Sequence, residues 1–248
     1  MVNRITKDDM IFVVRATSSF LLMTFCSLAM LSTATATLFQ ARRFYSERIA
    51  TPFAHLVLAV WGIHVELKQT QPFPLTQVVY ISNHTSTLDM FVLLSLGLPN
   101  ARFFLSGYLR KLLPLGLIGY LIGIFWTVDQ KFPEKRTRIF KRAAATLKRT
   151  GESVYLSPEG KRVLTGEIGH FNKGSFHLAT FLKAPIVPLH ITIPREMDPG
   201  VGLRAKPGVV QVYVKPTIDT QDWHIGEIIQ NKERVRNLFV QWHQEHKC

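Results

Sequence analysis

The chain has 248 residues, 30 Lys and Arg against 17 Asp and Glu, a net charge of +13 at pH 7, and 47% hydrophobic residues. This apolar content excludes a disordered chain, and two cysteines exclude a disulfide framework or a cysteine-rich zinc site. The length suits one domain of about 200 residues with an appendage. Because basic nucleic-acid-binding proteins are rarely this apolar, the combination favours a membrane surface as the partner.

The first predicted element is a membrane-spanning helix. Residues 16–39 carry no charge, and about 20 apolar residues suffice to cross a bilayer core. Arg15 precedes this run, and Arg42 and Arg43 follow it, so we predict a transmembrane helix at about residues 16–39. Arg42, Arg43 and Arg48, together with the basic domain behind them, favour a cytoplasmic location for the carboxyl side.

Two alternatives exist for this segment. A secretory signal peptide would be cleaved after residues 34–36, but its leading segment would be unusually long and would contain Asp8 and Asp9. The second alternative is a buried core helix, which is less expected because the apolar run lies at the N-terminus, ahead of the predicted domain. A second apolar stretch, residues 52–65, is too short to cross alone and is predicted as an interfacial helix or as part of a helical hairpin that lies in one leaflet. We therefore predict that residues 1–70 form a membrane anchor.

Residues 71–248 show alternating strand and helix patterns. The predicted strands are residues 77–82, 102–106, 124–128, 153–156, 186–193 and 209–215. The predicted helices are residues 88–96, 133–150, 174–182 and 225–246, with one more helix in the glycine-rich apolar stretch before residue 124. This alternation predicts an α/β domain with a largely buried sheet.

A histidine and an aspartate follow the first of these strands. His84 precedes Asp89 by five residues across a strand-to-helix turn, where Ser86 or Thr87 can cap the helix. A carboxylate placed there can accept a proton from one imidazole nitrogen and leave the other as a general base. The alternative is a turn in which His84 and Asp89 only cap and pair, and the spacing alone does not decide between them.

A second polar group follows the strand at 153–156. Glu159, Gly160, Lys161 and Arg162 collect charge at a tight turn, and an Arg beside flexible backbone suits a phosphate. Lys173 follows shortly before a helix whose N-terminus could add amide donors for an anion. The alternative is a solvated turn with an internal Glu–Arg pair.

Other chemistries lack their motifs. The sequence contains no Gly-x-Ser-x-Gly, no His-Glu-x-x-His and no Gly-x-x-x-x-Gly-Lys-Ser/Thr. His243 and His246 lie near each other on the last predicted helix but match no metal-binding motif, so no metal site is expected. The basic helix at 133–150 is either a solvated face or a face for anionic headgroups or an acidic cofactor.

Several blocks in order resemble the 1-acylglycerol-3-phosphate acyltransferase family, the lysophospholipid acyltransferases that share a His-x-x-x-x-Asp motif. The resemblance covers about residues 78–193. Its blocks are Asn83-His84-Thr85-Ser86-Thr87-Leu88-Asp89, Pro158-Glu159-Gly160-Lys161-Arg162, Phe171-Asn172-Lys173-Gly174 and Ala184-Pro185-Ile186-Val187-Pro188-Leu189. Gln130 stands where the family usually has an arginine, and Lys161 replaces a small hydroxyl residue. Both departures bear on the identity of the acyl acceptor.

The resemblance implies a mixed sheet flanked by helices and a role for each motif. His84 would act as the general base on the acceptor hydroxyl, and Asp89 would hold the imidazole and stabilise the imidazolium. The residues implied to bind the acceptor's phosphate or polar head are Glu159, Gly160, Lys161, Arg162 and Lys173. The acyl donor would be acyl-CoA or acyl carrier protein, and no metal or redox cofactor is implied.

The predicted function is therefore that of a membrane-bound acyltransferase of phospholipid biosynthesis that converts 1-acyl-glycerol-3-phosphate to phosphatidic acid. The expected location is a bacterial-type inner membrane, with the active site on the cytoplasmic side. One alternative keeps the chemistry and changes the acceptor to another lyso-lipid, such as a lyso-aminolipid. A second is a non-catalytic protein that binds anionic lipid. A nucleic-acid binder, the third, lacks any recognisable recognition module, so no nucleic-acid partner is expected.

Overall fold

The fold is built on one seven-stranded sheet. The computed structural model describes residues 6–200 and 202–246. The strands are β1 (Ile63–Lys68), β2 (Val79–Ser82), β3 (Ala101–Ser106), β4 (Phe125–Thr127), β5 (Ser153–Tyr155), β6 (Ile186–Thr192) and β7 (Gly208–Val214). Their order is β1-β7-β6-β2-β5-β3-β4, and all neighbours are parallel except β6 and β7. The prediction of an α/β fold with a mixed sheet is confirmed.

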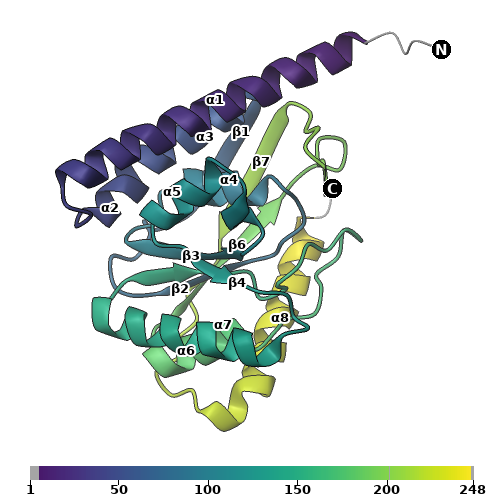
Figure 1. The fold of residues 1–248 in the computed structure, drawn as a ribbon. Coiled ribbons are helices and arrows are strands. Elements are labelled where there is room, and N and C mark those ends of the chain that lie inside the picture. Colours follow the sequence, from purple (N-terminus) through teal and green to yellow (C-terminus); the bar gives the residue numbers. More distant parts are fainter. Residues whose placement is uncertain (1–5, 201, 247–248) are drawn as a thin grey trace.

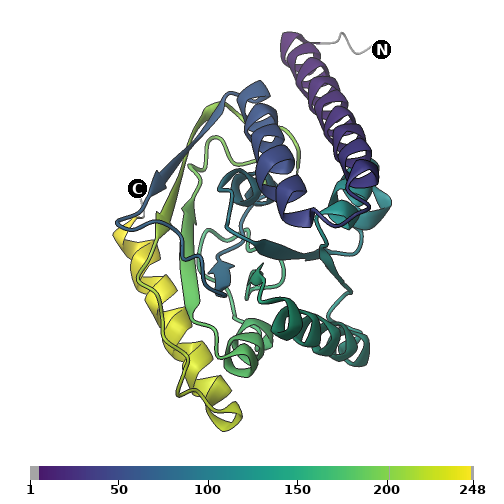
Figure 2. The ribbon, with the colours of Figure 1, turned by 90° about the vertical axis from the view of Figure 1, so that its left-hand side faces the viewer.

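Helices cover both faces of this sheet. They are α1 (Lys7–Ala36), α2 (Arg42–Phe44), α3 (Thr51–Val60), α4 (Asp89–Ser95), α5 (Leu115–Leu121), α6 (Pro133–Thr150), α7 (Gly174–Leu182) and α8 (Ile228–Glu245). Helices α1, α3 and α4 lie on one side of the sheet and α6, α7 and α8 on the other (Figures 1 and 2). One core includes Val92 of α4 and Val210 of β7, and the other includes Phe176 of α7 and Phe239 of α8. The central strands are thus buried on both faces, as their continuous apolar runs require.

The N-terminal helix is longer than predicted and lies along the domain (Figure 1). It begins at Lys7 instead of residue 16, because Thr6 and Asp9 form a capping box that satisfies its first amides. On its inner face Cys26, Met30 and Ala34 pack against α5. By length and composition α1 could cross a membrane, with a mean hydropathy of 1.7 and 17% of its most apolar window buried.

The predicted interfacial helix at residues 52–65 is partly wrong. Helix α3 ends at Val60, Gly62 adopts a φ of +69°, and Ile63–Lys68 forms the edge strand β1, parallel to β7. Isoleucine, valine and leucine alternate with polar residues in this strand, a period-two pattern that the preceding apolar run conceals. The predicted division at residue 70 therefore separates β1 from the sheet to which it belongs.

Ion pairs join the N-terminal segment to the sheet. Glu152, just before β5, pairs with Arg102 of β3 at 2.7 Å and with Arg42 of α2 at 3.5 Å. The indole N–H of Trp61 donates to Ser19 Oγ of α1 at 2.9 Å. The helical segment is consequently docked on the domain at several points, and its orientation to the sheet is set by these contacts.

Candidate active site

Both predicted polar motifs lie at one edge of the sheet. Strands β2 and β5 are parallel neighbours, with Tyr80 opposite Tyr155. The residues after their carboxyl ends, which carry His84 and Glu159, therefore meet in space. Ligands of open α/β sheets bind at such carboxyl ends.

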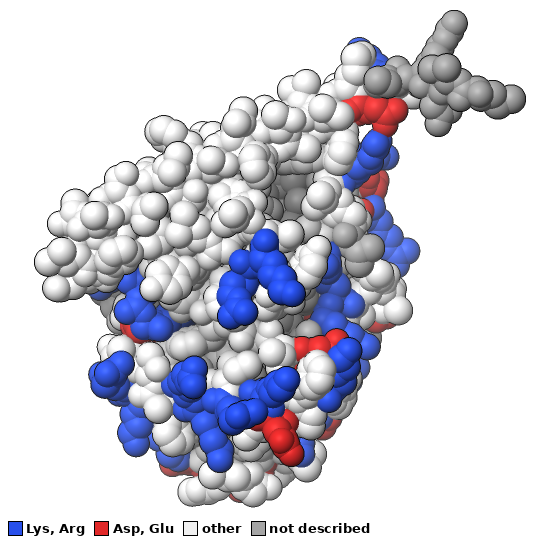
Figure 3. Space-filling view, in the orientation of Figure 1, with Lys and Arg blue, Asp and Glu red and all other residues white. Residues whose placement is uncertain are grey.

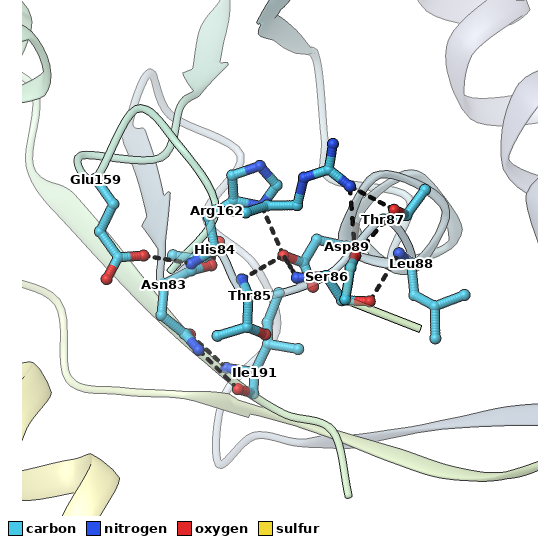
Figure 4. Close-up of polar contacts among 12 residues, drawn as sticks. Asn83, His84, Thr85, Ser86, Thr87, Leu88, Asp89, Glu159, Arg162 and Ile191 are labelled. Carbon is cyan, nitrogen blue, oxygen red and sulfur yellow. Dashed lines mark hydrogen bonds and ion pairs between the residues drawn. The ribbon is translucent and has the colours of Figure 1, made fainter. Parts of the chain in front are cut away.

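His84 and Asp89 form a direct pair (Figure 4). His84 Nδ1 lies 2.7 Å from Asp89 Oδ2, which also accepts the backbone N–H groups of Thr85 at 2.9 Å and Ser86 at 3.1 Å. Asp89 is 1% exposed, whereas the side chain of His84 is 30% exposed. With Nδ1 donating to the carboxylate, Nε2 is left as the nitrogen that can accept a proton from a ligand. The local spacing thus produces an oriented base.

Arg162 lies beside this pair. Its guanidinium donates from Nη1 to Thr87 Oγ1 and, at 3.4 Å, to the carbonyl of Gly200, and Figure 4 shows it next to the imidazole of His84. Thr87 Oγ1 donates to the Gly200 carbonyl at 3.0 Å, and neither Ser86 nor Thr87 makes the predicted side-chain cap of α4. Since a guanidinium carries five N–H donors, those left over can bind an anion next to His84.

Glu159 has a different role from the one predicted. It is 2% exposed, and its two carboxylate oxygens accept the backbone N–H groups of His84 at 2.6 Å and Gly169 at 2.7 Å. Burial raises the pKa of Glu159 to about 7, against the lowering effect of these two hydrogen bonds. Glu159 therefore positions the His84 backbone and does not face a substrate.

The remaining predicted residues are more exposed. Gly160 adopts a φ of +66°, and a Cβ there would lie 2.9 Å from Asn172 Nδ2, which explains the glycine. The side-chain amide of Asn172 donates to the carbonyls of Pro158 and Glu159 at 3.0 and 2.9 Å. Lys161 is exposed, and Lys173 lies at the start of α7, where it lines a groove between α6 and α7.

Two residues that hold the site were given no role from the sequence, although Asn83 begins the block that contains His84 and Asp89. The side-chain amide of Asn83 bridges β2 to β6 through both the N–H and the C=O of Ile191, each at 2.8 Å. Arg236 of α8 donates to the carbonyls of Gly169 and Ile168 at 2.7 and 3.1 Å, and so fixes the loop that Glu159 also holds. Both act over sequence separations of more than 60 residues.

An apolar cavity adjoins the pair. Met90 and Phe91, the two residues after Asp89, line it together with residues of α1, α3, α5 and β3, and its free volume is about 50 Å³. Within the part of the chain that the structure describes, no group of three or more His, Cys, Asp or Glu side chains is arranged to hold a metal ion.

Fold and site together define an α/β enzyme with a His–Asp pair and an arginine at the carboxyl edge of its sheet. The acyltransferase family model matches residues 64–192. The chain is 30% and 32% identical to the 1-acyl-sn-glycerol-3-phosphate acyltransferases alpha of Homo sapiens and Mus musculus, over 73% of this chain and 64% of each relative. It is 26% identical to the 1-acyl-sn-glycerol-3-phosphate acyltransferase of Limnanthes alba, over 78% of this chain and 69% of that protein. The chain belongs to the acyltransferase family.

A solved structure shares the fold. The crystal structure of the 1-acyl-sn-glycerophosphate acyltransferase PlsC from Thermotoga maritima matches with a TM-score of 0.76 at 18% identity, over 98% of both chains. The alignments to the human and mouse relatives span about two thirds of the length of those proteins. The family match covers strands β2 to β6, the His–Asp pair and the Glu159–Arg162 turn.

Proposed function

We propose that this acyltransferase transfers a fatty acyl group from a thioester to the free hydroxyl of 1-acyl-sn-glycerol-3-phosphate, giving phosphatidic acid. The observation that carries the proposal is the oriented His84–Asp89 pair with Arg162 beside it. The names of the curated relatives support the same acceptor. A base next to a fixed guanidinium suits an acceptor that holds both a hydroxyl and a phosphate.

The reaction follows from the tautomer that Asp89 imposes. His84 Nε2 takes the proton of the acceptor hydroxyl as its oxygen attacks the thioester carbonyl, and the Asp89 carboxylate stabilises the resulting imidazolium. The tetrahedral intermediate then expels the thiolate, which takes the proton back from the imidazolium. The carbon–sulfur bond breaks, the new ester bond forms, and no acyl-enzyme is needed.

The acceptor phosphate is assigned to the remaining donors of Arg162. Lys161 is exposed on the same turn and can add charge, and Gly160 keeps the turn free of a side chain. Gln130 Nε2 lies 3.1 Å from the position of a Cβ on Gly160, so the residue that departs from the family pattern touches this turn. That contact favours one second candidate, the same transfer to another lyso-lipid whose headgroup Gln130 would help to select.

The acyl chains are assigned to the apolar side of the molecule. The outer face of α1 exposes Phe20, Leu21, Phe25 and Leu28, a surface suited to a bilayer. The apolar cavity lined by Met90 and Phe91 is where an acyl chain would enter the protein. Because its free volume is about 50 Å³, a long chain requires α1, α4 or α5 side chains to move. We propose a membrane location, with the active site on the cytoplasmic side of a bacterial-type inner membrane.

A panel of acceptors and donors tests the proposal. Purified enzyme and its His84→Ala variant are assayed with several lyso-lipids and with acyl-CoA and acyl carrier protein, and His224→Ala, at an exposed histidine before α8, is the control. We expect lysophosphatidate to be the best acceptor and His84→Ala to lower turnover by roughly 10²–10⁴-fold. Faster turnover of another lyso-lipid would favour the second candidate. Unchanged turnover in His84→Ala would refute the mechanism, and lipid binding without any turnover would indicate a non-catalytic protein.

A further inference from the structure

A large groove lies between α6 and α7, away from the apolar cavity. Its volume is about 880 Å³, within the range of small-molecule sites. Its walls include two aromatic rings, those of Phe140 and Phe181. They also include three positively charged side chains, those of Arg136, Lys141 and Lys173. Among the described residues that line it there is no Asp or Glu. The groove is therefore concave, partly aromatic and uniformly basic.

The surroundings strengthen this positive charge. Helix α6 carries seven Lys and Arg residues against Glu134 alone, and Figure 3 shows Lys and Arg gathered over this part of the molecule while the surface of α1 is almost uncharged. Lys148 Nζ lies 5.2 Å from the centre of the Phe181 ring. Burial and the charge of Lys173 lower the pKa of His177, which also lines the groove. An anionic ligand matches this field.

The groove faces water and leads to the active site. It lies on the face of the sheet opposite α1 and α3, so a ligand reaches it from the aqueous side (Figure 1). Gln130 and Asn172, which lie just before the N-termini of α6 and α7, line one end of it, and Asn172 donates to the carbonyl of Glu159 at 2.9 Å. Glu159 in turn holds the backbone of His84. A ligand that fills the groove therefore ends at the turn beside the catalytic base.

We propose that this groove binds the phosphorylated nucleotide end of a coenzyme A thioester, so that its pantetheine arm passes the Pro158–Gly160 turn toward His84. The inference rests on the proposed acyl transfer and names its donor. A small anionic molecule with an aromatic base fits a concave groove with aromatic walls, whereas a carrier protein needs a broad exposed surface.

Each wall has a definite role. Phe140 stacks on Phe104 with ring centres 4.8 Å apart, and Arg136 donates to the carbonyl of Val128 at 3.2 Å, so this wall is held in place before a ligand arrives. Phe181 is 49% exposed and offers a ring face for the base. Lys141 and Lys173 are exposed cations for the phosphates.

Charge reversal on α6 tests the proposal with a neighbour as control. Lys141 lines the groove and Arg142, the next residue, does not, so Lys141→Glu and Arg142→Glu change the net charge of the helix equally. The donors are an acyl-CoA, the corresponding acyl-pantetheine thioester without nucleotide, and acyl carrier protein. Adenosine 3′,5′-bisphosphate serves as a calorimetric probe of binding that does not depend on turnover.

We expect Lys141→Glu to raise the KM for acyl-CoA and the Kd of the bisphosphate about tenfold, with the pantetheine thioester unaffected. Arg142→Glu should change each constant less than twofold. Equal effects of the two variants, no binding of the bisphosphate to the wild type, exclusive use of acyl carrier protein, or displacement of the bisphosphate by phosphatidic acid vesicles would each overturn the proposal. The pantetheine thioester lacks the nucleotide, so its turnover measures the acyl transfer alone. If the enzyme does not turn it over, the proposed acyl transfer fails, whether or not the groove binds the nucleotide.

Discussion

Replacement of Asp89 by Asn isolates the charge that supports the base. The amide keeps the shape of the carboxylate, and its oxygen can still accept the N–H groups of Thr85 and Ser86. With His84 Nδ1 and Asp89 Oδ2 at 2.7 Å, the charges of imidazolium and carboxylate are centred about 4 Å apart and attract by about 4 kcal/mol at an effective dielectric constant of about 20. Loss of this attraction as the imidazolium forms should lower kcat by about 10³-fold.

The assay is kcat under saturating donor and acceptor, with thermal unfolding as the control for folding. Since the pair acts as a unit, the double variant His84→Ala with Asp89→Asn should be no slower than His84→Ala alone. KM for the acceptor should change little, because Asp89 is buried and does not face the substrate.

Two results would refute this reasoning. If Asp89→Asn kept kcat within about threefold of wild type while His84→Ala was inactive, the carboxylate charge would not support the base. If the two substitutions multiplied their effects in the double variant, they would act on separate steps.

Three further predictions rest on individual contacts. Arg162→Lys keeps the positive charge but loses the planar guanidinium that can donate two hydrogen bonds to one phosphate. The KM for lysophosphatidate should therefore rise about tenfold, with a smaller change in kcat. A KM equal to that of the wild type would contradict the assignment of the phosphate to Arg162. Glu159→Ala leaves the buried N–H groups of His84 and Gly169 unpaired at a cost of about 1–3 kcal/mol each, so thermal stability and kcat should both fall, as melting curves and turnover would show. Burial and the nearby His243, His246 and Lys215 lower the pKa of His190 to about 3. Because the unfolded chain protonates this histidine near pH 6.5, the free energy of unfolding should fall by about 2 kcal/mol from pH 6.5 to 5. In His190→Met, denaturant unfolding should show less of this loss, and an identical loss would assign it to other groups.

Elements with strong local patterns were predictable from the sequence. Helices α6 and α7 have the predicted bounds. Pro133 begins α6 and Gly151 follows its last residue. Gly174 begins α7, and the β-branched strand that starts at Ile186 requires this helix to end before it. Strand β1 was missed because its alternation follows directly on the apolar run of α3. The start of α1 was missed because the capping box at Thr6 lies in a charged segment outside the apolar window.

The sequence by itself determined the His84–Asp89 pair and the α/β class, since the pair lies within one strand-to-helix turn and the class follows from local periodicity. Only the tertiary structure decided which charges serve the site. It brought Arg162 to Thr87 beside the His84–Asp89 pair, turned Glu159 inward to two backbone amides, and formed the groove at Lys141 and Lys173 between α6 and α7. These placements depend on strand pairing and helix docking between residues far apart in the chain, and such long-range contacts leave no local pattern in the residues that make them.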